Sequence, residues 1–213
     1  MKTLTRIALA ASIIALSGPL ALAGKATDLK PSLAKPGTLV IEEDFSASSL
    51  PKAWVPAKGE WIPHDGVMIG KEKKEDQHAA VLTLTQPNHN SIIRFSFKLD
   101  GTDGFALSYN SAKGHLFRIQ VATGGITINK DKDKKDPNSK AAVLGKAEGK
   151  FEQGQWYSML VEIQGGQVAV QTDNGVKLNA TNPELDVDKT GYRFVMRNSA
   201  FALDDVRVWE TQP

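Results

Sequence analysis

The sequence contains no cysteine, and aromatic residues make up only 7% of its 213 residues. A chain without cysteine has no disulfide framework and needs no oxidising machinery to fold. Neither sign of charge dominates, since 26 Lys and Arg face 24 Asp and Glu. This balance gives no electrostatic case for nucleic acid or an anionic membrane as a partner. With 41% hydrophobic residues, the composition is that of a folded globular chain.

Several enzyme motifs are also missing. The sequence has no Gly-x-Ser-x-Gly elbow, no phosphate-binding glycine loop and no dinucleotide fingerprint. No two of its four histidines have a spacing suited to a shared transition metal: His64, His78, His89 and His115. These absences argue against the commonest acyl, phosphoryl and hydride transfer reactions and against zinc chemistry.

The first 23 residues have the pattern of a secretory signal peptide. A basic start (Lys2 and Arg6) precedes an apolar stretch that ends in Ala21-Leu22-Ala23, whose small side chains suit a signal peptidase. A membrane anchor is the alternative, but Gly18-Pro19 cuts the apolar run below the ~20 residues that span a bilayer. We therefore predict a signal peptide over 1–23, a periplasmic or secreted location and no membrane attachment after cleavage. Its removal leaves 24 basic and 24 acidic residues, a formally neutral chain.

The rest of the chain is predicted to be all-β. Residues 24–37 lack apolar periodicity and are expected to form a linker or N-terminal arm, followed by one domain over 38–213. Apolar and polar residues alternate in 93–99 and in most later segments, and Gly165-Gly166 indicates a tight hairpin. Many short strands separated by turns predict a two-sheet antiparallel jelly-roll sandwich, favoured over an up-and-down barrel. Alternation fixes faces and leaves strand order open.

Polar side chains occupy the outward faces of these strands. If 93–129 forms neighbouring strands of one sheet, that face displays Arg94, Ser96, Lys98, Ser108, Asn110, Arg118, Gln120, Thr127 and Asn129, with Glu162 on a later strand. Amide, hydroxyl and guanidinium groups suit sugar hydroxyls, each of which both donates and accepts. An ordinary solvated face is the alternative, and the scarcity of acidic residues on these strands favours binding. The ligand-binding candidates are Arg94, Lys98, Asn110, Arg118, Gln120 and Asn129.

Two charged segments invite other hypotheses. The last strand changes its alternation phase at Asp204-Asp205, as a β-bulge would, and the first strand carries Glu42-Glu43-Asp44. If these strands pair, Glu43, Asp44 and Asp205 are candidates for a structural calcium site, because calcium prefers carboxylate oxygens. The alternative is a bulge whose carboxylates cap backbone amides. Residues 130–136 are expected to form a solvated loop or, alternatively, a mobile rim over a groove.

Scattered motifs carry a family resemblance that covers about residues 38–210. They are Trp54 to Gly70, His78-Ala79-Ala80, Phe97-Lys98-Leu99-Asp100-Gly101, Gly114-His115-Leu116-Phe117-Arg118, Gly154-Gln155-Trp156 and Asp204-Asp205-Val206. The chain resembles small exported proteins of the 3-keto-disaccharide hydrolase family, in the concanavalin A-like lectin/glucanase superfamily of jelly rolls. The resemblance implies a carbohydrate or modified sugar bound on the concave sheet or its rim.

The resemblance also frames the catalytic candidates. The sequence lacks the Glu-x-Asp-x-x-Glu strand of glucanases, and Glu162 is the one carboxylate on the outward faces. A 3-keto sugar can instead undergo elimination by a base at carbon 2, for which His115 with Arg118, or His78, are candidates. By alternation His115 shares the face of the core residue Phe117, which favours a buried histidine over a base. The alternative for the whole protein is a non-catalytic structural or interaction module of the cell envelope.

Overall fold

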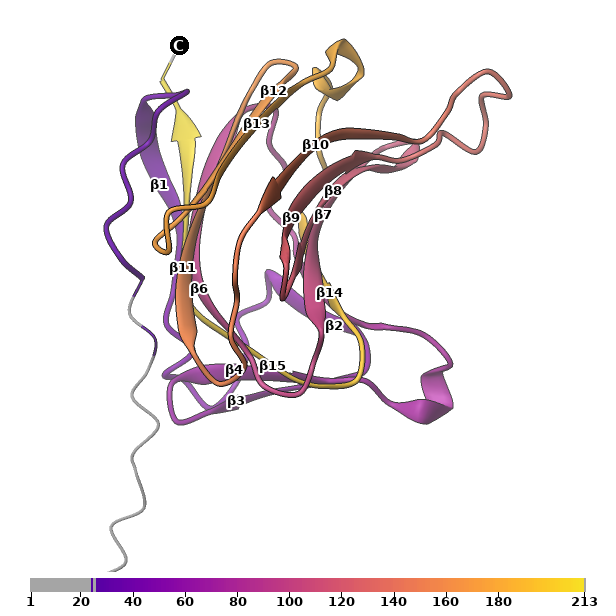
Figure 1. Cartoon of the computed structure of the whole chain (residues 1–213). Coiled ribbons are helices and arrows are strands. Elements are labelled where there is room, and N and C mark those ends of the chain that lie inside the picture. Colours follow the sequence, from indigo (N-terminus) through magenta and orange to yellow (C-terminus); the bar gives the residue numbers. More distant parts are fainter. Residues whose placement is uncertain (1–23, 25, 213) are drawn as a thin grey trace, which may run out of the picture.

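The chain folds into two antiparallel sheets packed face to face (Figure 1). The computed structural model describes residues 24 and 26–212, so the predicted signal peptide lies outside the described residues. Within this part, none of the helices is long and apolar enough to cross a membrane. The described elements are β1 (Pro36–Glu43), β2 (Trp54–Lys58), β3 (Glu60–His64), β4 (Val67–Lys71), η1 (Lys74–Asp76), β5 (Ala80–Leu84), β6 (Ser91–Leu99), β7 (Gly104–Ser111), β8 (Gly114–Ala122), β9 (Gly125–Lys130), β10 (Ala142–Glu148), β11 (Trp156–Gln164), β12 (Gln167–Thr172), β13 (Lys177–Thr181), η2 (Pro183–Leu185), β14 (Tyr192–Met196) and β15 (Ser199–Thr211).

Sheet A has the order β13-β12-β11-β6-β15-β4-β3, with β1 also paired to β15. The predicted pairing of the first and last strands is therefore confirmed. The predicted bulge is confirmed too, because the register of β15 against β6 shifts between Asp204 and Arg207, where Asp205 has a φ of 43°. The expected hairpin at Gly165-Gly166 joins β11 to β12.

Sheet B has the order β10-β9-β8-β7-β14-β5-β2. Its inner face packs on that of sheet A through interlocking aromatic rings. Phe95 of β6 meets Phe194 of β14 at a centroid distance of 5.2 Å, and Phe97 of β6 meets Phe105 of β7 at 4.8 Å. Trp54 and Trp61 are buried, as expected of tryptophan in a sandwich core. This shared core confirms the predicted jelly-roll sandwich.

The expectation that 93–129 lies in one sheet is wrong. Strand β6 belongs to sheet A, whereas β7, β8 and β9 belong to sheet B, because the chain crosses between layers after Leu99. The outward polar residues are therefore divided between opposite sides of the molecule. Arg94, Ser96, Lys98 and Glu162 belong to sheet A, and the polar residues of 104–129 belong to sheet B.

The two outer faces differ in shape and in covering. The outer face of sheet B, formed by β7, β8 and β14, curves inward and opens to the right in Figure 1. Across the outer face of sheet A runs the predicted N-terminal arm, whose residues 26–34 bond to β11 and β15 before β1 begins at Pro36. In the part of the chain that the structure describes, the sheet B face is thus left as an open concave surface.

Candidate functional site

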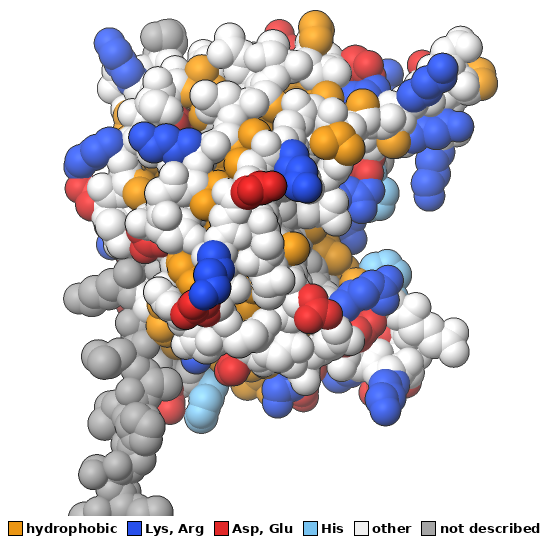
Figure 2. All heavy atoms as spheres, viewed as in Figure 1, with side chains coloured by type: hydrophobic (Ala, Val, Ile, Leu, Met, Phe, Trp, Pro, Cys, Tyr) orange, Lys and Arg blue, Asp and Glu red, His pale blue; other side chains and the backbone are white. Residues whose placement is uncertain are grey.

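The concave face of sheet B holds an open groove of about 500 Å³. Its lining combines polar and charged side chains with a small apolar floor: His78, Ser108, His115, Arg118, Gln120, Arg193 and Arg197, with Ala106 and Val195. Figure 2 shows Lys, Arg and His side chains gathered along this right-hand, concave edge of the molecule. A saccharide has polar edges and apolar C–H faces, which such a lining complements.

Strand register arranges the lining in two parallel rows. In the polar row, Arg193 of β14 pairs with Ser108 of β7, which pairs with Arg118 of β8. The neighbouring row places Val195 opposite Ala106, and Ala106 opposite Gln120. Adjacent strands lie about 4.8 Å apart, so the two arginines stand about 10 Å apart across Ser108. This spacing, together with the small side chains of Ala106 and Val195, leaves room for a sugar ring.

His115 lies on the outer surface, not in the core, and the expectation of a buried histidine is wrong. Opposite Tyr109 stands Phe117, but opposite Asn110 stands His115, so β8 carries one extra residue, Leu116. This bulge reverses the alternation and turns the imidazole toward the groove. The sequence alone gives no sign of it, because Leu116 fits either face of a strand.

The surroundings of His115 keep its imidazole neutral. Partial burial, followed by the positive charges of Arg193 and Arg118, holds the pKa of His115 below its usual value of 6.5. Its Nδ1 lies 3.1 Å from Oδ1 of Asn110. With Nδ1–H donating to this oxygen, Nε2 carries the free lone pair. Asn110, predicted as a ligand-binding residue, therefore orients the histidine.

Arg118 is held in place by the charged segment that follows β9. Both its Nε, at 3.2 Å, and its Nη2 donate to the carboxylate of Asp131. Lys130 is buried and its Nζ lies 2.6 Å from Glu184. The first two residues of 130–136 are thus anchored and support the site. Most of the rest of this segment is exposed, as expected of a solvated loop.

Two further predicted residues extend the polar surface, and His78 faces the groove from a separate loop. The amide of Asn129 donates to Oε1 of Gln120 at 2.8 Å, which joins β9 to β8. His78 follows η1, and its Nδ1 lies 2.7 Å from the carbonyl oxygen of Ala79. The structure therefore brings His78 to the same groove as His115 and Arg118 of β8, which lie far from it in sequence.

Sequence reasoning missed Arg193. Alternation in 192–196 places this side chain on the outward face, but only the pairing of β14 with β7 brings it into the groove. Its guanidinium is half-buried, and this burial lowers the pKa of Arg193 from its usual value. Arg118 and Arg197 have carboxylate partners in Asp131 and Glu72, whereas Arg193 forms no ion pair with any residue that the structure describes.

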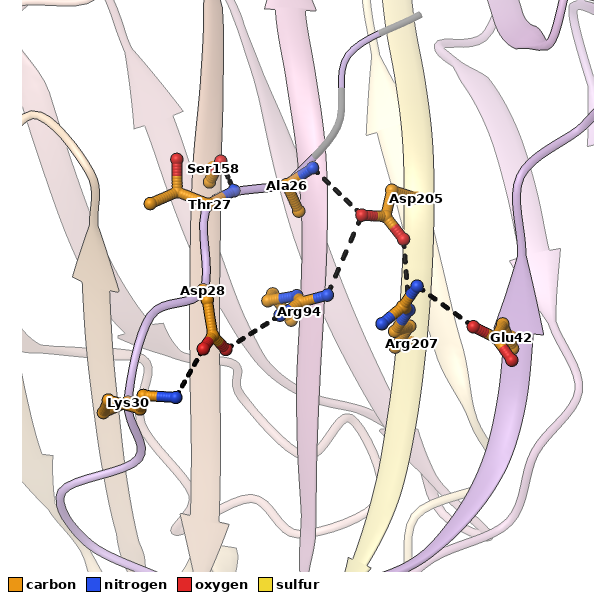
Figure 3. A network of polar contacts seen from close by, with 9 residues as sticks. All are labelled: Ala26, Thr27, Asp28, Lys30, Glu42, Arg94, Ser158, Asp205 and Arg207. Carbon is orange, nitrogen blue, oxygen red and sulfur yellow. Dashed lines mark hydrogen bonds and ion pairs between the residues drawn. The ribbon is translucent and has the colours of Figure 1, made fainter.

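The structure separates Arg94, Lys98 and Glu162 from this groove. Arg94 is buried beneath the arm, 3.3 Å from Asp28 and 3.8 Å from Asp205 (Figure 3). Lys98 pairs with Asp100 at 3.9 Å and lies over the Trp156 ring. These cations lie outside the groove because β6 belongs to sheet A.

Glu162 anchors the arm. The carboxylate is fully buried and accepts the backbone N–H groups of Ser32 at 2.8 Å, Leu33 at 2.7 Å and Ala34 at 2.9 Å. The Ser32 hydroxyl donates to the same carboxylate at 3.1 Å. These hydrogen bonds account for the burial of the Glu162 carboxylate without a catalytic role.

The three carboxylates predicted to bind calcium accept hydrogen bonds from backbone N–H groups instead. Glu43 accepts the N–H of Phe45, Asp44 accepts that of Ser46, and Asp205 accepts that of Ala26. Asp205 also pairs with Arg207 at 3.2 Å, and a carboxylate shared with arginines is a poor calcium ligand. Among residues 24 and 26–212, no three His, Asp or Glu side chains are grouped so that they hold a metal ion. The donor set does not fit calcium in this arrangement, and calcium binding stays a prediction.

A comparison with protein families assigns the domain. The profile of the 3-keto-alpha-glucoside-1,2-lyase-like domain matches residues 41–204. The chain belongs to this family. This 3-keto-alpha-glucoside-1,2-lyase-like domain covers both sheets and includes the groove residues from His78 to Arg197. No curated protein sequence matches the chain.

Solved structures identify the sandwich as concanavalin A-like. The carbohydrate-binding module CBM66 from Bacillus subtilis matches with a TM-score of 0.58 at 10% identity, covering 74% of this chain and 96% of its own. SCLam, a non-specific endo-beta-1,3(4)-glucanase from family GH16, matches with a TM-score of 0.61 at 13% identity, covering 84% and 95%. Porphyranase B from Zobellia galactanivorans gives 0.62 at 12% identity, covering 87% and 99%. At these identities the likeness shows the shared fold.

Proposed function

We propose that the groove of sheet B binds a 3-keto-glycoside and that the protein cleaves its glycosidic bond by elimination across C1 and C2. The observation that carries the proposal is that one polar groove holds His115, whose pKa is held below 6.5, and the guanidinium of Arg193, which has no carboxylate partner in the described part of the chain. A base and a cation are the two groups that proton abstraction beside a ketone needs. The family match supports the same substrate class.

In this reaction the Nε2 lone pair of His115 accepts the proton from C2, which is acidic because it neighbours the C3 ketone. The electron pair moves onto the ketone oxygen and forms an enolate. The enolate then collapses, a C1–C2 double bond forms and the C1–O bond breaks. The departing alkoxide takes the proton back from the imidazolium, so the products are an alcohol and an unsaturated 3-keto sugar. Addition of water to the double bond completes a net hydrolysis.

Arg193 is the residue suited to stabilise the enolate. Arg118 already shares its charge with Asp131, and Arg197 pairs with Glu72 at 3.2 Å. The Arg193 guanidinium is half-buried without a carboxylate partner in the described part of the chain, so its field is less screened. Electrostatic stabilisation of a developing oxyanion by one such donor typically contributes about 10²–10³-fold to the rate.

The experiment follows cleavage of a 3-keto-glucoside in heavy water by mass spectrometry and NMR. Elimination followed by hydration leaves deuterium at C2 of the released sugar, whereas direct hydrolysis leaves the original proton. We expect deuterium at C2 with the wild type, and loss of turnover with His115→Gln at an unchanged melting temperature. His64→Gln is the matched control, because His64 is exposed on β3 of the other sheet. Cleavage without deuterium refutes elimination, and binding without cleavage favours a non-catalytic module.

We also propose that the protein is located outside the cytoplasm after residues 1–23 are removed. The basic start, the interrupted apolar run and Ala21-Leu22-Ala23 support it. Fractionation of cells that express the full chain tests the location. Retention in the cytoplasm would contradict it.

A further inference from the structure

The N-terminal end of the arm lies against a buried carboxylate. Asp204 is 2% exposed, and its Oδ1 accepts the N–H of Asp205 at 2.6 Å. The backbone N–H of Gly24 also points to this carboxylate and acts to lower its pKa. Two residues later, the N–H of Ala26 donates to Oδ2 of Asp205 at 3.0 Å (Figure 3). The arm thus enters the fold with its backbone nitrogens directed at two adjacent aspartates.

The position of Gly24 admits no side chain. A Cβ on this residue would lie 2.4 Å from the Trp156 ring, far inside van der Waals contact. Gly24 is itself buried, against the ring of Trp156 of β11. The fold therefore requires glycine at the residue that directly follows Ala21-Leu22-Ala23.

Among the residues that the structure describes, no cation forms an ion pair with Asp204. Asp205 and Asp44 are close enough to raise its pKa, and the register partner on β6 is the uncharged Ser96. Arg94 and Arg207 direct their guanidinium groups at Asp205 instead. Burial is the main cause that raises the pKa of Asp204 to about 6. A buried carboxylate in this state is stabilised by any positive charge brought to it.

We propose that the fold contains a site for a processed N-terminus, in which the α-ammonium group of Gly24 forms a buried ion pair with Asp204. A signal peptidase hydrolyses the Ala23–Gly24 peptide bond with one water molecule, which leaves a carboxylate on Ala23 and an amine on Gly24. This amine takes up a proton at neutral pH and occupies the place of the amide N–H that faces Asp204. Cleavage thereby converts a neutral hydrogen bond into an ion pair and fixes the arm on sheet A.

The pH dependence of folding stability differs between the unprocessed chain and the processed chain that begins at Gly24. With Gly24 in a peptide bond, the folded pKa of Asp204 is about 6, above its usual 3.8, so stability falls as the pH rises through about 6. With a free α-ammonium group, the ionised carboxylate is paired and this fall is absent. Stability of the processed chain then falls only at higher pH, as the amine loses its proton above its usual pKa of about 8.

The experiment compares a chain released to begin at Gly24 with a chain that keeps Ala23 before it, each with and without Asp204→Asn. At pH 7 we expect the Gly24 chain to have an unfolding constant at least about tenfold smaller, by denaturant titration, because a buried charge gains its partner. The Asp204→Asn variant retains the Oδ1 that accepts the Asp205 N–H, and in this pair of chains the difference should vanish.

Two further measurements use the wild-type sequence, so they do not depend on how well the Asp204→Asn variant folds. Acetylation of the Gly24 amine in the wild type should cancel the gain, and the intact mass of the exported protein should correspond to a chain that begins at Gly24. Equal stability of the Gly24 and Ala23 chains overturns the proposal, as does a gain that survives acetylation or the Asp204 substitution. An exported chain with a different first residue also overturns it.

Discussion

Replacing Glu162 tests whether the outer face of sheet A anchors the arm while the groove of sheet B carries the activity. The buried carboxylate accepts three backbone N–H groups of the arm and one hydroxyl. Hydrogen bonds to a charged group contribute roughly 1.5–3 kcal/mol each, but an undocked arm recovers part of this in water. We therefore expect Glu162→Ala to cost about 2–5 kcal/mol in the free energy of unfolding. In a domain of this size, that corresponds to a fall of about 5–15 °C in melting temperature.

Glu162→Gln sharpens the test because it keeps the size of the side chain. Its single carbonyl oxygen still accepts, but its NH₂ group faces backbone donors, so a large part of the loss should remain. Glu148→Ala is the control, since Glu148 is exposed at the end of β10 and should change stability by less than about 0.5 kcal/mol.

The assay combines thermal unfolding with amide hydrogen exchange at Ser32, Leu33 and Ala34. These three amides should be protected in the wild type and exchange freely in Glu162→Ala, whereas turnover of the 3-keto-glucoside should persist below the new melting temperature. Slow exchange at these amides in the variant would refute the anchoring role. Loss of turnover at unchanged stability would restore Glu162 as a catalytic candidate.

Three further predictions concern single groups. The acidic limb of the pH–rate profile should lie below pH 6.5 and move to higher pH in Arg193→Gln, because the Arg193 charge helps to lower the pKa of His115. A limb that stays in place in this variant would contradict the effect of Arg193 on His115. Burial lowers the pKa of Lys189 to about 8 from 10.5, so stability should rise between pH 8 and 10.5 by up to about 3 kcal/mol, and this rise should be missing in Lys189→Met when both proteins are unfolded across that range. Gly70→Ala should cost about 1–3 kcal/mol, measured by denaturant titration, because the new Cβ would lie 2.5 Å from the Trp61 ring.

The strands and their buried faces follow from the sequence because alternation is a local property. The segment 93–99 predicts β6, and the phase change at Asp204-Asp205 predicts the bulge in β15. Pairing between distant strands is not local. A jelly roll sends consecutive strands to opposite layers, so Arg94 and Arg118 lie on different faces although both alternate correctly.

The groove residues show the same limit at the level of side chains. Alternation predicts the wrong face for His115 because one extra residue, Leu116, shifts the register of β8. It does not single out Arg193, because the neighbours of this residue come from β7, more than eighty residues earlier in the chain. It predicts an outward carboxylate at Glu162, because the sequence does not reveal that the arm covers it. In each case the deciding contact joins segments that alternation treats separately.

The central claim is that the concave groove of sheet B, and not the outer face of sheet A, is the saccharide site. Its most direct test is a titration of the His115→Gln variant with a 3-keto-disaccharide, followed by backbone amide NMR shifts. We expect shift changes centred on Ser108, Arg118 and Arg193, with the arm unaffected. Changes centred on Arg94 and Ser158, beneath the arm, would contradict it.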